Sequence, residues 1–131
     1  MTNPKFAVSA SVVRYLLALD ALRGAGGIRT IDVARYLNIK KPSAHTMLNN
    51  LKDAGLLTKD ELGIAHLTSY GTELTSQYRR YYCAVSELLA RVLPSSADIK
   101  KAACALVAEL SEQVLEELCA QGGAEGTLNV S

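Results

Sequence analysis

Apolar residues return every three or four positions in five segments of the chain, and this spacing places side chains on one face of a helix. The five predicted helices span about 8–22, 31–37, 42–54, 70–93 and 98–119. The longest of them stops before Pro94, which cannot continue a helix. We expect Thr30 to cap the second helix, and Thr68 or Ser69 to cap the longest one. The chain is therefore predicted to be mainly α-helical.

Two short apolar runs between the third helix and the longest helix predict a β-hairpin. The runs at 56–59 and 64–67 flank a turn at 60–63 that contains Asp and Gly. A short helix, a tight connection, a second helix and a hairpin follow one another in the order of a winged helix-turn-helix. The predicted fold class is mainly α with a small β-hairpin wing, followed by a C-terminal helical region.

The same pattern divides the chain into three parts. We expect a winged helix-turn-helix domain at 1–68, a helical dimerisation region at 69–120 and a flexible tail at 121–131, because the last part is rich in glycine. In the last predicted helix, Glu109, Glu112 and Glu116 lie away from the apolar stripe, so we expect them on the outer face.

Charge is distributed unevenly along the chain. With 14 basic and 13 acidic residues, the formal net charge of +1 by itself argues against a nucleic-acid or membrane partner. However, residues 1–60 contain nine basic and four acidic side chains and have a net charge of +5. Residues 61–131 have a net charge of −4. The two halves are therefore expected to have different functions, and the basic half suits a polyanion.

Several classes of protein are not expected. No stretch approaches 18 consecutive apolar residues, and the first ten residues do not resemble a signal peptide, so the cytoplasm is the expected location. The three cysteines have no CxxC spacing, unlike a disulfide framework or a structural zinc site. No Ser/His/Asp set, phosphate-binding glycine loop or metal-hydrolase motif is present, so an enzyme is not expected.

The predicted helix at 42–54 has side chains suited to reading DNA bases. Asn can pair with adenine through two hydrogen bonds, and Ser and Thr can donate or accept. Basic residues around this helix suit contacts with phosphates. The expected base-reading residues are Ser43, His45, Thr46, Asn49 and Asn50; the expected phosphate contacts are Lys40, Lys41, Lys52 and Lys59, with further charge from Arg29 and Arg35. Double-stranded DNA is therefore the predicted partner.

Two other interpretations of this pattern stay open. A winged-helix module that binds only proteins has the same order of elements, and a generic helical domain has the same solvated polar face. His66, in the predicted wing, fits a phosphate contact or an ordinary surface position. A measurement of DNA binding distinguishes these interpretations from the predicted DNA-binding function.

Three segments resemble the diphtheria-toxin-repressor family of iron- and manganese-responsive repressors. They are IDVARYLNIKKPS at 31–43, MLNNLKDAGLL at 47–57 and LTSYG at 67–71. The likeness covers roughly residues 8–119, and some of its motifs are shared with other winged-helix regulators such as the MarR group. It implies a homodimeric repressor that binds a pseudo-palindromic operator through the helix at 42–54. It also implies a divalent metal as co-repressor.

The metal-binding positions that the resemblance implies are mostly not matched. They fall at Arg14, Leu17, Tyr82, Ser86, Cys104, Val107 and Ala108. Of these, only Cys104 clearly matches a ligand of the family, and one soft ligand does not rebuild an octahedral site for manganese or iron. We therefore expect no confident cofactor and not the usual metal site. Cys83 and Cys104, on adjacent predicted helices, are weak candidates for a soft-metal or thiol sensor, and buried packing residues are the alternative.

Overall fold

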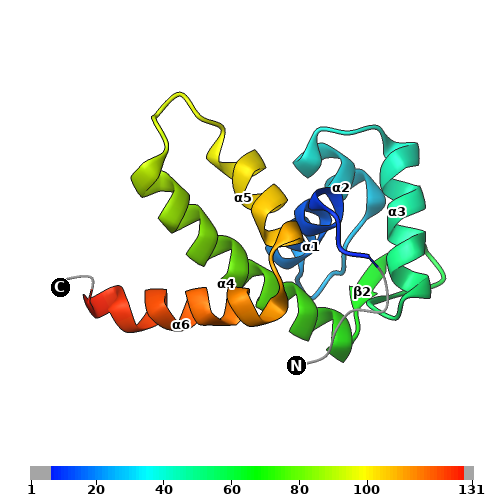
Figure 1. Cartoon of the computed structure of the whole chain (residues 1–131). Helices are drawn as coiled ribbons and strands as arrows, with labels where there is room; N and C mark the ends of the chain where they lie inside the picture. Colours follow the sequence, from blue (N-terminus) through cyan, green and yellow to red (C-terminus); the bar gives the residue numbers. More distant parts are fainter. Residues whose placement is uncertain (1–6, 129–131) are drawn as a thin grey trace.

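The computed structural model describes residues 7–128, and the side chains of residues 7–122. This part of the chain forms helices and one antiparallel hairpin, which confirms the predicted fold class. The elements in order are α1 (Ala10–Leu22), α2 (Thr30–Leu37), α3 (Lys41–Asp53), β1 (Leu57–Lys59), β2 (Ala65–Leu67), α4 (Ser69–Val92), α5 (Ile99–Glu109) and α6 (Glu112–Leu128) (Figure 1).

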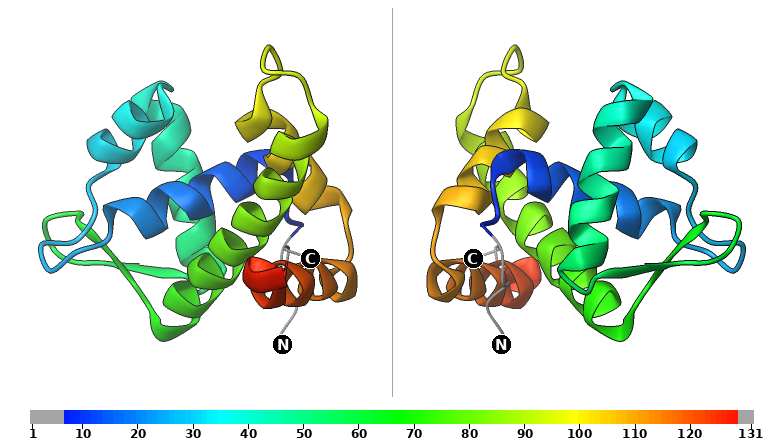
Figure 2. Two further views of the ribbon diagram at one scale, coloured as in Figure 1. Left: turned by 90° about the vertical axis from the view of Figure 1, so that its left-hand side faces the viewer. Right: turned by 90° about the vertical axis from the view of Figure 1, so that its right-hand side faces the viewer.

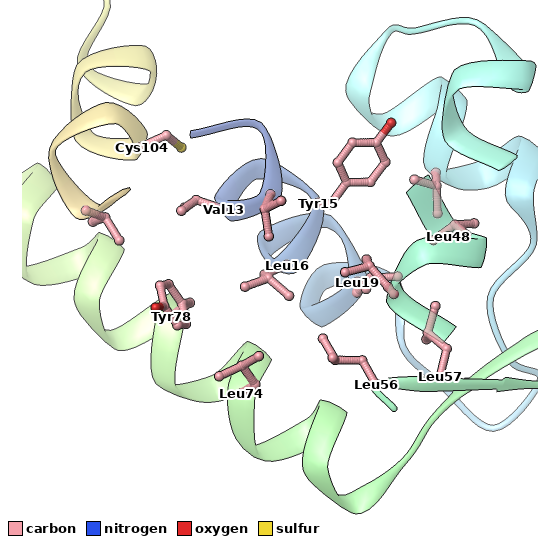
Figure 3. Close-up of a cluster of buried hydrophobic side chains, with 14 of the residues drawn as sticks. Val13, Tyr15, Leu16, Leu19, Leu48, Leu56, Leu57, Leu74, Tyr78 and Cys104 are labelled. Atoms are coloured by element: carbon pink, nitrogen blue, oxygen red, sulfur yellow. The ribbon is translucent and has the colours of Figure 1, made fainter. Parts of the chain in front are cut away.

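Helix α1 is the centre of the molecule. The helix-turn-helix (α2 and α3) and the hairpin lie on one side of it, and α5 and α6 lie on the other (Figure 2). Val13, Leu16 and Leu19 of α1 have no exposed surface. Figure 3 shows α1 side chains facing Leu48 of α3 and Leu74 of α4. Because α1 is covered on two sides, it joins the basic half of the chain to the acidic half through one core.

The connection between α2 and α3 is held in shape by Asn38. Its backbone is left-handed, with φ of 56°, and its N–H group donates to the carbonyls of Ala34 and Arg35 at the end of α2. Asn adopts this conformation more easily than most residues, and the bonds satisfy carbonyls that the helix end leaves free. Pro42 then stands in the first turn of α3, where no N–H group is needed.

The prediction that Thr30 caps α2 is wrong. The N-cap is Arg29, and Thr30 is already helical. The reason is that Ile28 forms a β-bridge with Ala65 in the hairpin, which keeps the backbone extended up to Arg29. The carbonyl of Arg29 then accepts the first helical hydrogen bonds, from Asp32 and Val33.

Asp60 shapes the turn of the hairpin. Its Oδ1 accepts hydrogen bonds from the backbone N–H groups of Leu62 at 2.9 Å and Ile64 at 3.0 Å. These bonds hold the pKa of the Asp60 carboxyl below its usual value, and the bond from Ile64 has the largest effect. His66 Nε2, at 3.3 Å from Oδ2, lowers this pKa further. Gly63 has φ of 79°, which L side chains rarely adopt. The turn is therefore set by a side chain and a glycine, as expected for an Asp/Gly turn.

A closely packed contact connects the hairpin to α4. The Thr68 hydroxyl accepts from the N–H of Gly71 at 3.0 Å and donates to the carbonyl of Gly55 at 2.6 Å. This confirms the predicted cap by Thr68. The Cα of Gly71 faces the carbonyl oxygen of Leu56 so closely that a Cβ atom would overlap it. The LTSYG segment is thus the contact at which the wing meets the long helix.

The single last helix predicted at 98–119 is wrong, because the chain forms two helices there. Leu110 is extended, with ψ of 148°, and Ser111 starts α6 by accepting from the N–H of Val114 at 3.2 Å. Glu112 follows in the first turn, where the helix dipole favours a negative charge. Helix α6 therefore changes direction and packs across α4 (Figure 1).

The predicted outer position of the three glutamates is wrong for two of them. Glu112 accepts a hydrogen bond from Gln77, and Glu116 accepts from Tyr81 and Arg80, so both face α4. The change of direction at Ser111 is the cause, since it turns this face of α6 inward. Helix α6 continues to Leu128, and residues 129–131 lie outside the described residues, so the flexible tail at 121–131 stays a prediction.

Candidate nucleic-acid interface

Helix α3 has one buried side and one polar side. Ala44, Leu48 and Leu51 are buried and fasten the helix to the core. The predicted base-reading residues Ser43, His45, Thr46 and Asn50 are exposed, and Asn49 is half-buried. The structure therefore presents these five side chains on the outside of one rigid element.

The N-terminus of α3 is basic and bears no side-chain cap. Lys40 is the N-cap residue and makes no capping hydrogen bond through its side chain, and Lys41 is the first helical residue. Both are exposed. Free backbone N–H groups, the helix dipole and two ammonium groups together suit a phosphate.

A shallow groove lies between the start of α2, the start of α3 and the turn of the wing. Its volume is about 360 Å³, and Arg29, Lys41 and Leu62 are among the residues that line it. Leu62, at the tip of the wing, is 84% exposed. Sequence reasoning did not select Leu62 as an interface residue, because a lone apolar residue in a turn gives no signal of its partner.

The wing and α3 are joined by a chain of side-chain hydrogen bonds. Lys59 Nζ, on β1, donates to Asn49 Oδ1 at 2.9 Å. Asn49 Nδ2 lies 3.2 Å from His45 Nε2, one helical turn earlier. The structure thus brings together three residues that the sequence suggested separately, one as a phosphate contact and two as base readers. Lys52, by contrast, is exposed and pairs weakly with its neighbour Asp53 at 3.9 Å.

The residues at the positions implied for a metal do not fit a divalent cation. Cys104 is fully buried, and burial raises the pKa of its thiol. Arg14 and Lys100 lie near enough to act on this thiol, and Asp98 is the one carboxylate in the described part of the chain that acts on it. Among residues 7–122, no three His, Cys, Asp or Glu side chains gather as a metal site would require. This part of the chain offers no donor set for manganese or iron.

The two cysteine candidates have different surroundings. Cys83 is exposed on α4, whereas Cys104 belongs to the apolar core. Cys119, on α6, is half-buried, and its thiol donates to the carbonyl of Arg80 at 3.6 Å. Burial raises the pKa of the Cys119 thiol as well. Buried, protonated thiols are poor nucleophiles, so the packing alternative fits Cys104 best.

The family model described as MarR family matches residues 11–62, from α1 to the turn of the wing. This is less than half of the chain. No curated protein matches the sequence.

Solved structures match nearly the whole chain. The manganese regulator SloR superposes with a TM-score of 0.70 and 21% identity, covering 96% of this chain and 56% of its own. IdeR from T. acidophilum has a TM-score of 0.64 and 21% identity, covering 85% of this chain and 53% of its own. The fold is that of a winged helix-turn-helix regulator. This winged-helix chain spans about half the length of these two regulators.

A third solved structure has nearly the same length as this winged-helix chain. A hypothetical protein from Sulfolobus solfataricus has a TM-score of 0.61 and 19% identity, covering 88% of this chain and 90% of its own. The resemblance to the diphtheria-toxin-repressor family is therefore supported at the level of the fold.

None of the helices in residues 7–128 combines the length and apolar character needed to cross a membrane.

Proposed function

We propose that this winged-helix chain is a sequence-specific DNA-binding transcription regulator. The observation that carries the proposal is the outer face of α3, which holds Ser43, His45, Thr46, Asn49 and Asn50 on a helix anchored by buried apolar residues. A helix of this kind enters the major groove and reads base edges with short polar side chains. The MarR-family match and the regulator folds support the same function.

The lysines around α3 are proposed to hold the DNA backbone. Lys40, Lys41 and Lys52 are exposed on or beside α3, and Lys59 lies on the wing. Arg29 lines the same groove as Lys41 and adds to this surface. Such contacts fix the position of the protein on the duplex without reading its sequence.

We propose that the protein acts as a homodimer on a pseudo-palindromic operator. Large apolar side chains remain exposed on the acidic half, with Leu88 at 38% and Val92 at 66% on α4, and Val114 at 39% on α6. Contiguous apolar patches mark protein–protein interfaces, and we propose that these three side chains contribute to one. A two-fold dimer places two copies of α3 on successive half-sites.

We propose that this chain does not share the metal dependence of the manganese regulator. SloR is described as a manganese regulator. The buried thiol of Cys104, with Arg14, Lys100 and Asp98 near it, does not supply a manganese site. We propose that the usual manganese or iron site is not used. No catalytic activity is proposed.

Salt dependence of duplex binding tests the proposal. With four phosphate contacts in each of two protomers, log K should fall against log salt with a slope of about −7. Absence of binding to random duplex at low salt contradicts the proposal and favours a module that binds proteins.

A selected-DNA assay with divalent metal, chelator or thiol reductant tests whether metal or thiol chemistry controls DNA binding. A large metal effect without a thiol effect contradicts the loss of the metal site, and a large thiol effect favours a thiol sensor.

A further inference from the structure

The amide of Asn49 has a defined orientation in this structure. Lys59 Nζ carries three N–H donors and no acceptor, so the atom that faces it at 2.9 Å must be the Asn49 oxygen. A reversed amide would place its NH₂ group against the ammonium group, which is a donor against a donor.

His45 completes the orientation from the other side. With the oxygen of Asn49 toward the wing, its NH₂ group faces His45 Nε2 at 3.2 Å. The ring nitrogen must then accept, so the neutral ring carries its proton on Nδ1. The amide is held between a donor on the wing and an acceptor on α3.

The groups that Asn49 still has free determine what it can read. Its amide has two N–H groups and two oxygen lone pairs, and the two neighbours use one of each. One N–H and one lone pair remain, which are in number and kind the groups that pair with the N7 acceptor and the N6 amino group of adenine in the major groove. Guanine presents only acceptors there, so it would leave the Asn49 oxygen opposite an acceptor.

We propose that Lys59 and His45 are positioning residues that fix the Asn49 amide to read adenine, so that a wing lysine sets sequence preference. The inference rests on the proposed function and deepens it. It also gives Lys59 a second role beside the phosphate contact that the sequence suggested.

A selected-DNA assay on four proteins tests the inference. The wild type should select adenine at one position of each half-site, and Asn49→Ala should identify that position by erasing the preference. Lys59→Met should reduce the adenine preference there by about fivefold or more, since a good two-bond contact discriminates by about 1–3 kcal/mol. Lys59→Arg should restore it, because a guanidinium group also donates to the amide oxygen.

Lys52→Met is the matched control, because Lys52 is an exposed lysine of the same unit with no bond to Asn49. It should weaken binding to all sequences equally. The inference is overturned if Lys59→Met behaves like this control, or if the wild type selects guanine at the position that Asn49 reads.

Nitrogen-15 NMR of the His45 ring in the DNA-free protein provides a separate readout. We expect the proton of the neutral ring on Nδ1, and a neutral ring protonated on Nε2 overturns the inference. If His45 has the expected form but the wild type binds no duplex, the proposed function fails and the assignment of adenine fails with it, whereas the orientation of the amide stands.

Discussion

The hydroxyl of Tyr81 donates a hydrogen bond of 2.6 Å to a carboxylate oxygen of Glu116, and this bond joins α4 to α6. Arg80 adds an ion pair to the same carboxylate at 3.1 Å. The hydrogen bond from Tyr81 lowers the pKa of Glu116, and Arg80 lowers it further by a smaller amount. Burial and the neighbouring carboxylate raise the pKa of Tyr81. The charge of one glutamate therefore strengthens the contact between α6 and α4.

Glu116→Gln should destabilise the protein at neutral pH by about 1 kcal/mol, a modest value because the carboxylate is 37% exposed and solvent screens it. The folded pKa of Glu116 is lowered, so its contribution is present above the unfolded pKa of about 4.3 and is lost as pH falls through the folded pKa. Urea unfolding of both proteins at pH 7 and at about pH 3 measures the difference, which should shrink at the lower pH. Glu117→Gln, on the same helix, is the control and should have little effect.

Gly71→Ala should destabilise the fold by about 2–3 kcal/mol. The added Cβ would overlap the carbonyl oxygen of Leu56, which is backbone and bears the hydrogen bond from Thr68. Gly24→Ala is the control, because a Cβ there meets no atom within 4 Å. Chemical denaturation measures the stability of both variants, and equal midpoints would contradict the close contact between Gly71 and Leu56.

The ion pair between Asp20 and Arg79, at 2.9 Å, should respond unequally to removal of its two members. The Asp20 side chain is only 10% exposed, whereas Arg79 is 56% exposed. Arg79→Met leaves a nearly buried carboxylate whose other cation, Arg23, is 3.7 Å away. Asp20→Asn leaves an arginine that water can solvate. The Arg79 variant should therefore lose more stability in thermal unfolding, and the reverse order would contradict this view of the pair.

Cys83 and Cys104 should differ in their reaction with iodoacetamide. Cys83 is exposed and should be labelled in the folded protein at neutral pH. Cys104 is buried, and burial raises its thiol pKa, so it should react only after unfolding. Mass spectrometry of native and denatured samples locates the label. Rapid native labelling of Cys104 would favour the thiol-sensor alternative.

Asn49→Ala and Lys41→Ala should weaken DNA binding in different ways. Loss of a base contact should relax sequence preference at one position, with a cost of about 1–3 kcal/mol on the preferred site. Loss of the lysine should weaken all sequences alike and reduce the salt slope by about 1 per protomer. Competition binding with operator and random duplex measures both, and a uniform loss for Asn49→Ala would argue against base reading.

The order of elements could be predicted from the sequence because each one has a local signal. Apolar spacing marks α1 to α4, Asp60 and Gly63 mark the turn of the wing, and Thr68 marks the start of α4. The start of α6 also has a local signal, Ser111 followed by Glu112, but the apolar spacing runs through it and conceals the break.

The contacts of the candidate site could be predicted only in part. The exposed polar face of α3 follows from its buried stripe, Ala44, Leu48 and Leu51. The bond from Lys59 to Asn49 does not, because it depends on how the wing folds back on α3. The N-cap of α2 was missed for the same reason, since a distant strand residue, Ala65, sets the backbone of Ile28.

The bridge between Ile28 and Ala65 has a mechanical consequence. Two backbone bonds, at 2.7 and 2.8 Å, fasten the hairpin to the loop after α1, and the bond from Thr68 to Leu56 closes its other end. The hairpin cannot swing away from α3 without breaking bonds at one of these places. These bonds therefore hold the wing at a set distance from α3 within the chain. In the proposed homodimer, adjustment to operators with different half-site separations would therefore come from movement between the two protomers.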